Sequence, residues 1–189
     1  MRGIVAAAIA ALGLGLASEG DFKITKQKWP TPNRERPIVN LPEQLRQQNW
    51  RGPSGQGSCV HASWIMLLRW QGQHAYADYW RKKYGDGEYY DRMASRLDAE
   101  GIKWAGTVGK TDVAFLEWAH RTRRGAIVTW SPRHVVCIVH FDDKWAGILD
   151  NNQIDRIKWI PRDQFVREWS NRGSWAMTPI YTPPPPIGG

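Results

Sequence analysis

The chain has 189 residues, the length of one domain, and its hydrophobic content of 42% excludes a disordered protein. It carries 26 Lys and Arg residues against 18 Asp and Glu residues, which gives a formal net charge of +8 at pH 7. The basic residues are dispersed and no nucleic-acid-binding motif accompanies them, so we expect a solvated surface and no nucleic-acid partner. The charge is compatible with loose attraction to an anionic cell envelope.

The N-terminal segment has the pattern of an export signal. Arg2 supplies a positive charge, residues 4–16 are apolar or small, and Gly15-Leu16-Ala17 ends the run with the small residues that precede a cleavage site. We predict a signal peptide over residues 1–17. The mature protein is then secreted or extracytoplasmic, in the periplasm or at the cell surface, without stable membrane insertion. The alternative, an uncleaved anchor, needs a longer apolar run to cross a bilayer.

Proline marks both ends of the remaining chain. Residues 18–48 are polar and contain several prolines, which predicts an extended N-terminal arm, with the core beginning near Asn49. Residues 182–189 are rich in Pro and Gly and predict a C-terminal tail. A single domain over residues 49–181 is expected between the arm and the tail.

Helices are expected first in this domain. Apolar residues recur with helical spacing in four segments. Ser58 and Thr111 are placed to cap the first and the fourth helix, and Gly101 can end the third in a left-handed conformation. The predicted helices cover residues 59–70, 74–84, 88–100 and the segment that follows Thr111.

The second half has the periodicity of strands. Short β-rich runs separated by turn residues predict an antiparallel sheet, followed by a short helix after Pro161 and a last strand. The strands are residues 126–130, 135–141, 145–149, 154–160 and 174–181, and the helix is residues 162–169. Helices followed by an antiparallel sheet make an α+β fold.

Cys59 has the setting of a nucleophile. It follows the glycine-rich loop Gly55-Gln56-Gly57-Ser58 and opens the most apolar predicted helix, and a helix N-terminus favours a thiolate. His134 begins a predicted strand and Asp150 ends the next one, so antiparallel pairing brings the two side chains together at one edge of the sheet. An imidazole that a carboxylate orients is the base that such a nucleophile needs.

The second cysteine, Cys137, leaves an alternative open. Two cysteines in an exported protein form a disulfide by default, and that bond would make Cys59 structural. Cys137 lies three residues after His134 on the same predicted strand, where successive side chains alternate between faces. If His134 faces Cys59, we therefore expect Cys137 to face away from it.

Three motifs together resemble a known family. They are Gly55-Gln56-Gly57-Ser58-Cys59-Val60-His61-Ala62-Ser63, His134-Val135-Val136 and Ile148-Leu149-Asp150, and they resemble the Cys, His and Asp motifs of papain-like cysteine peptidases. The group that they resemble most contains the peptidase domains of bacteriocin exporters, which cleave leaders after a double glycine. Residues 161–169 also resemble the short helix that follows the sheet in that group.

The resemblance implies a papain-like cysteine peptidase fold, in which the helix that begins with the Cys packs on the antiparallel sheet. It implies hydrolysis of a peptide or isopeptide bond in a protein or peptide substrate, through a thioester acyl-enzyme. Cys59 would be the nucleophile, His134 the general base and then the acid, and Asp150 the group that holds the imidazole.

The same resemblance implies a Gln six residues before Cys59 that stabilises the oxyanion, but this sequence has Pro53 there. We predict that Gln56 takes this role. The alternatives are that Gln47 or Gln48 reaches into the site, or that the oxyanion hole is incomplete.

Other candidate residues have simpler interpretations. His61 is interpreted as a surface or capping residue rather than a second base. Asn151 and Asn152 either replace Asp150 as the orienting group or are turn residues. No pair among the five His residues has the i,i+4 spacing, with an intervening Glu, that is typical of a metal site, so we expect neither a metal nor another cofactor.

Two other functions stay open on the same residues. A CHAP-type peptidoglycan amidase or endopeptidase, acting on a cell-wall peptide, also has a Cys helix followed by a His strand. A noncatalytic papain-fold binding module would dock through its Trp-rich surface and proline tail. The missing Gln at position 53 favours this second alternative.

Overall fold

A computed structural model describes residues 36–107, 111–131 and 133–181, and all of these belong to one compact unit, Glu35–Gly189. The predicted signal peptide at residues 1–17, residues 18–35 of the predicted arm and the predicted tail at residues 182–189 lie outside the described residues. Those predictions therefore stay predictions.

The helices of the first half follow the apolar spacing closely. The first has the predicted bounds, and nearly all of its side chains are buried, which is why its apolar residues run almost without interruption. The α-helices of the described residues are α1 (Cys59–Trp70), α2 (His74–Lys83), α3 (Met93–Ala99), α4 (Val113–Arg121) and α5 (Arg162–Ser170), with 3-10 turns η1 (Glu43–Leu45) and η2 (Tyr90–Arg92).

Both predicted N-terminal helix caps, Ser58 and Thr111, are wrong. The Ser58 side chain makes no capping hydrogen bond to α1. Asp112 rather than Thr111 caps α4, since Asp112 Oδ1 accepts a hydrogen bond from the backbone N–H of Phe115 at 3.0 Å. Gly101 follows α3 with a φ of +63°, which confirms its left-handed position.

The third helix begins later than predicted. Residues 88 and 89 are not helical, and the turn η2 precedes α3, which starts at Met93. The Glu88 carboxylate instead accepts a hydrogen bond from Arg96 at 2.9 Å and pairs with Arg92 at 3.7 Å. These contacts tie the Glu88 side chain to the turns that follow it.

The predicted antiparallel sheet is confirmed and has six strands in the order β1-β6-β2-β3-β4-β5. The strands are β1 (Trp104–Thr107), β2 (Ala126–Ser131), β3 (His134–Phe141), β4 (Trp145–Leu149), β5 (Ile157–Pro161) and β6 (Ala176–Pro179). β1 was not predicted, because three of its residues are half-buried and one is exposed, with no clear alternation. β5 starts three residues later than expected, since residues 151–156 form turns.

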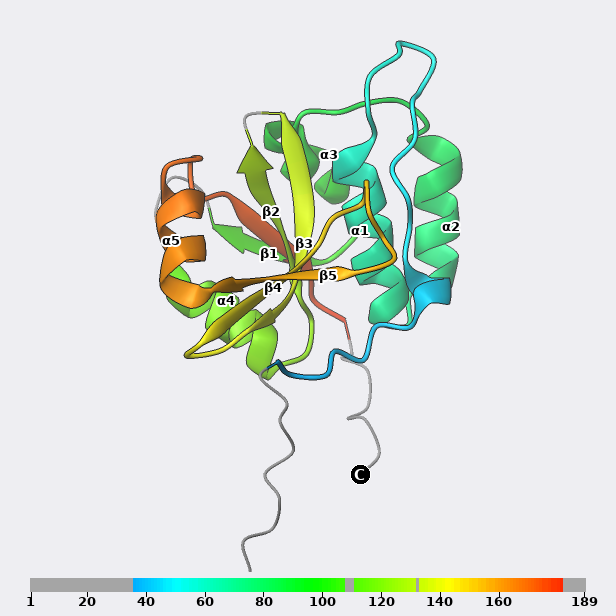
Figure 1. Cartoon of the computed structure of the whole chain (residues 1–189). Helices are drawn as coiled ribbons and strands as arrows, with labels where there is room; N and C mark the ends of the chain where they lie inside the picture. Colours follow the sequence, from blue (N-terminus) through cyan, green and yellow to red (C-terminus); the bar gives the residue numbers. More distant parts are fainter. Residues whose placement is uncertain (1–35, 108–110, 132, 182–189) are drawn as a thin grey trace, which may run out of the picture. The chain divides into compact units, whose positions relative to one another are not determined.

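The sheet is covered on both faces (Figure 1). On one face, side chains of α1, α2 and α3 pack with Ile127, Val135 and Cys137 in one apolar cluster. On the other face, side chains of α4 and α5 pack with Val128 and Val136 in a second cluster. The fold is α+β as predicted, but only the first three α-helices form the layer that carries Cys59.

The core begins earlier in the chain than predicted. Leu41 is 1% exposed and belongs to the cluster around α1. Arg46 fixes this segment, because its Nε donates to the carbonyl of Leu41 at 3.1 Å and its NH1 donates to the carbonyl of Ile154 at 2.6 Å. The expectation that the core starts near Asn49 is therefore wrong.

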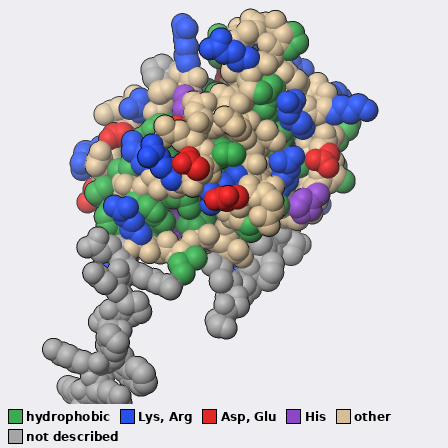
Figure 2. Space-filling view, turned by 45° about the vertical axis from the view of Figure 1, so that its right-hand side comes forward, with side chains coloured by type: hydrophobic (Ala, Val, Ile, Leu, Met, Phe, Trp, Pro, Cys, Tyr) green, Lys and Arg blue, Asp and Glu red, His purple; other side chains and the backbone are tan. Residues whose placement is uncertain are grey.

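Charged side chains are spread over the surface. Figure 2 shows Lys and Arg side chains scattered over one face of the molecule rather than gathered in a single patch. Among the described residues, no helix combines the length and the apolar character that crossing a membrane requires.

Candidate active site

Cys59 is the first residue of α1 and follows a tight turn. Arg51 and Gly57 form an antiparallel bridge, and the carbonyl of Gly52 accepts a hydrogen bond from the N–H of Gly55 at 2.9 Å. Gly55 has a φ of +76°, a conformation that glycine adopts readily. The turn delivers the chain to the start of α1, where the first N–H groups have no partner within the helix.

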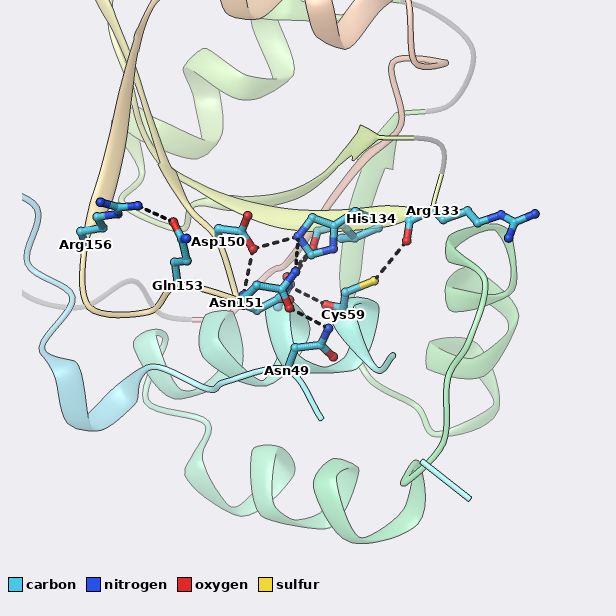
Figure 3. Close-up of polar contacts among 11 residues, drawn as sticks. Asn49, Cys59, Arg133, His134, Asp150, Asn151, Gln153 and Arg156 are labelled. Atoms are coloured by element: carbon cyan, nitrogen blue, oxygen red, sulfur yellow. Dashed lines mark hydrogen bonds and ion pairs between the residues drawn. The ribbon is translucent and has the colours of Figure 1, made fainter. Parts of the chain in front are cut away.

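His134 and Asp150 lie side by side, as the strand pairing predicts. His134 begins β3 and Asp150 follows β4, and these strands pair antiparallel with Cys137 opposite Leu149. His134 Nε2 and Asp150 Oδ1 are 2.8 Å apart (Figure 3). Because Nε2 contacts the carboxylate, Nδ1 is the ring atom left for a partner on the other side.

The thiol of Cys59 lies beside this pair. Cys59 Sγ is 3.9 Å from the backbone carbonyl oxygen of Arg133, the residue directly before His134. Figure 3 shows the three side chains of Cys59, His134 and Asp150 converging from α1 and from the adjacent ends of β3 and β4. The structure thus brings together the three residues that the sequence singled out.

The electrostatics of the histidine follow from these contacts. Burial alone lowers the pKa of His134, but its hydrogen bonds with Asp150 and Cys59 outweigh burial and raise the pKa to about 9. The bond to His134 in turn lowers the pKa of Asp150. His134 is therefore an imidazolium at neutral pH, and a neighbouring imidazolium is one of the features that activate a cysteine nucleophile.

Asn151 has a role that neither sequence interpretation anticipated. Its side chain is fully buried, and Nδ2 lies 2.7 Å from the carbonyl of Val135, 2.8 Å from Ser63 Oγ and 3.2 Å from the carbonyl of Cys59. The amide therefore links the first turns of α1 to the start of β3. Its position directly after Asp150 was the only signal in the sequence.

Asn152 lies at the edge of the histidine. Its backbone N–H donates to Asp150 Oδ1 at 2.8 Å, and its Nδ2 is 3.4 Å from His134 Nε2. Its Oδ1 accepts a hydrogen bond from Asn49 Nδ2 at 3.0 Å. Asn152 thus supports the Asp150 carboxylate rather than replacing it, and Asn49 is a second polar residue near the site that the sequence did not indicate.

The three Gln candidates for the oxyanion role differ in position. Gln47 accepts a hydrogen bond from Arg69 in the last turn of α1, so its side chain is held at the opposite end of the helix from Cys59. The backbone carbonyl of Gln48 accepts a hydrogen bond from the Gln47 side chain at 3.0 Å. Gln56 lines a cavity beside Cys59 and His134, which leaves it as the candidate among the three.

Two further residues from the sequence analysis belong to the core. His61 is buried, its Nδ1 accepts a hydrogen bond from Trp80 Nε1 at 3.0 Å, and burial lowers its pKa to about 4. The interpretation of His61 as a surface residue is therefore wrong. Cys137 is also buried, and burial raises its pKa to about 12. No cluster of His, Cys, Asp and Glu among the described residues is suited to hold a metal ion.

Cys59 and Cys137 are both free and form no disulfide. The expectation that Cys137 faces away from Cys59 is nevertheless wrong. Cys137 packs in the cluster around α1, on the same face of the sheet as the Cys59 helix. Its Sγ donates to the carbonyl of Ser63, one turn along α1 from Cys59. His134 reaches Cys59 from the end of β3, where the residue lies at the sheet edge and face alternation no longer decides its neighbours.

Among the comparisons with known proteins, only those with solved structures gave a match. No family model matches the sequence, and no curated protein matches it. A solved structure from Bacillus anthracis, described as a C39-like peptidase, matches with a TM-score of 0.55 at 14% identity, over 79% of this chain and 100% of that chain. The chain therefore has the papain-like peptidase fold.

A second solved structure is similar to part of this chain. It is the double glycine motif protease of an AMS/PCAT transporter, solved in complex with the leader peptide. It matches with a TM-score of 0.46 at 20% identity, over 65% of this chain and 84% of that chain.

Proposed function

We propose that this chain is an exported cysteine peptidase that hydrolyses a peptide or isopeptide bond. The observation that carries the proposal is the position of the His134 ring, which bonds the Asp150 carboxylate through Nε2 and interacts with the Cys59 thiol. The export half of the proposal rests on the apolar N-terminal pattern alone.

The proposed reaction follows the acyl-transfer logic of a Cys-His-Asp triad. The Cys59 thiolate attacks the carbonyl carbon of the scissile bond, and the His134 imidazolium then protonates the leaving amine. This leaves a thioester on Cys59. Neutral His134 next takes a proton from water, which attacks the thioester and releases the acid.

The oxyanion of each tetrahedral intermediate needs hydrogen-bond donors. The first N–H groups of α1 supply backbone donors beside Cys59, and we assign the side-chain donor to Gln56, which lines the same cavity. Asp150 holds the imidazole with Nδ1 toward Cys59, so that the proton moves between Nδ1, the sulfur and the leaving group.

The proposal is tested by clearing of casein and of purified peptidoglycan in parallel zymograms. The wild-type chain should clear casein, and Cys59→Ala and His134→Ala should abolish clearing while the circular dichroism spectrum stays unchanged. Cys137→Ala is the matched control, because it removes the other thiol and should keep the activity.

The same gels separate the alternatives. Clearing of peptidoglycan alone would replace the peptidase with a CHAP-type cell-wall hydrolase that uses the same residues. Clearing of neither substrate by the folded wild-type chain, with Cys59 unreactive, would favour a noncatalytic binding module.

A further inference from the structure

A cavity of about 260 Å³ opens directly beside Cys59. Three segments form its walls: the start of α1 with the loop before it, residues 88–90, and the start of β3. The Cys59 thiol points toward the carbonyl of Arg133, which is itself a lining residue, so the sulfur faces this space. The proposed chemistry uses Cys59, Gln56 and His134 from the first and third of these walls and gives residues 88–90 no role.

Much of the remaining wall is apolar or aromatic. Val60 and Val135 are buried beneath the cavity, each 2% exposed. Tyr90 is half-buried and packs against Trp175, with ring centroids 5.1 Å apart. Tyr89 is 58% exposed at the rim, where its ring is open to contact with a bound side chain.

Glu88, the acidic residue in the wall, pairs with two arginines. Glu88 Oε2 accepts a hydrogen bond from Arg96 at 2.9 Å, and Oε1 pairs with Arg92 at 3.7 Å. The Glu88 side chain is almost buried, at 8% exposure. Because two cations already face this carboxylate, the cavity does not select a basic side chain.

A hydrogen bond joins two of the walls. The Asp86 carboxylate accepts bonds from the Ser54 hydroxyl at 2.6 Å and from the N–H of Gly87 at 2.8 Å. The Ser54 bond joins the segment that carries Tyr89 and Tyr90 to the loop that precedes Cys59, and the Gly87 bond fixes the Asp86 carboxylate within its own segment. The Ser54 bond thus fixes two walls of the cavity relative to each other.

We propose that this cavity is a substrate subsite that takes an aromatic side chain next to the scissile bond, an inference that rests on the proposed peptidase function. A glycine would leave the space filled with water. An aromatic ring displaces this water, packs on Val60 and Val135, and meets Tyr89 and Tyr90 in the edge or offset geometries that aromatic rings prefer.

The test begins with a complex peptide library digested by the full chain and read by mass spectrometry. Peptides should be cleaved next to Phe or Tyr at one fixed position relative to the scissile bond. Synthetic fluorogenic peptides that differ only at this position, with Phe, Leu, Gly, Lys or Glu, then give kcat/KM. We expect kcat/KM to be at least about 10-fold higher for Phe than for Gly.

Two tyrosine variants connect the preference to the cavity. Tyr89→Ala should reduce the ratio of kcat/KM for Phe over Gly several-fold. Tyr76→Ala is the matched control, since Tyr76 is similarly exposed at 40% but lies on α2 and does not line the cavity. It should leave the ratio unchanged.

Covalent labelling of Cys59 tests the subsite even if no peptide in the library is cleaved. Acyloxymethyl ketones that carry Phe or Gly are compared by the rate at which they alkylate Cys59, read by mass spectrometry. Faster labelling by the Phe reagent supports the subsite. Active enzyme with equal or higher rates for Gly, Lys or Glu overturns the subsite but not the peptidase. No cleavage, together with no selective labelling, overturns both.

Discussion

At the scale of single residues, Asn151 connects the nucleophile to its base. Its Nδ2 contacts the carbonyls of Cys59 and Val135, while its buried Oδ1 has no hydrogen-bond partner among the described residues. A buried acceptor without a partner costs about 1–3 kcal/mol. The amide is therefore retained for the contacts of its nitrogen, which fix α1 against β3 where Cys59 and His134 meet.

Asn151→Ala is expected to lower kcat at least about 10-fold with little change in KM, because catalysis depends steeply on the sulfur to imidazole geometry. The variant should also lose about 2–4 kcal/mol of the free energy of unfolding, since two buried carbonyls lose a donor. Gln153→Ala, in the same loop but exposed, is the control. An unchanged kcat in a folded Asn151→Ala protein would contradict this role.

The raised pKa of His134 predicts how stability depends on pH. Because the pKa is about 9 in the folded state and 6.5 in the unfolded state, the folded state binds the proton more tightly. The stabilisation is complete below pH 6.5, declines as the pH rises, and is lost above about pH 9. Its size is about 3 kcal/mol.

Urea unfolding at pH 6 and at pH 9.5 measures this effect. The difference in the free energy of unfolding between the two pH values should be smaller in His134→Ala than in the wild-type chain. An equal difference in the two proteins would show that His134 is not the group responsible.

At the scale of elements, the segment that carries Tyr89 packs tightly against the loop before α1. A Cβ at Gly87 would lie 2.6 Å from the Cβ of Gln56 and 3.1 Å from the carbonyl of Gly57. Gly87→Ala should therefore displace the Gln56 loop and lower kcat/KM about 10-fold. Gly85→Ala is the matched control, because a Cβ there meets nothing within 4 Å. Equal kinetics for the two variants would contradict this packing.

The elements that hold the site were predictable from the sequence, and the contacts between them were not. α1 and β3 are nearly continuous apolar runs, so the positions of Cys59 and His134 at their starts followed directly. Asp150 followed from antiparallel pairing. Cys137 was assigned to the wrong face, because the assignment counted alternation from His134, which reaches Cys59 from the end of β3 rather than from a face of the sheet.

Local sequence also could not place residues that tertiary contacts control. Glu88 was predicted to start a helix, but α3 begins only at Met93, and Tyr90 before it packs against Trp175 from the far end of the chain. Asn151 looks like any turn residue until α1 and β3 are packed around it. His61 looks amphipathic and exposed, yet Trp80 and Tyr84 enclose its ring.

At the scale of the whole molecule, the segment before Asn49 is part of the folded unit. Leu41 packs in the core, and Arg46 bonds the carbonyl of Ile154 across the domain. Leu41→Ala should lower the free energy of unfolding by about 2–5 kcal/mol, measured by urea denaturation. Ile38→Ala, at an exposed position of the same segment, should change it little. Equal stability of the two variants would mean that this segment does not contribute to the core.

The rate at which iodoacetamide alkylates Cys59 at pH 7 tests the central claim most directly, because it reports the activated sulfur without any assumption about the substrate. The account predicts that Cys59 in the wild-type chain reacts at least about 10-fold faster than free cysteine, and that His134→Ala removes the difference. A wild-type Cys59 that reacts no faster than free cysteine would contradict the assignment of Cys59, His134 and Asp150 as a catalytic unit.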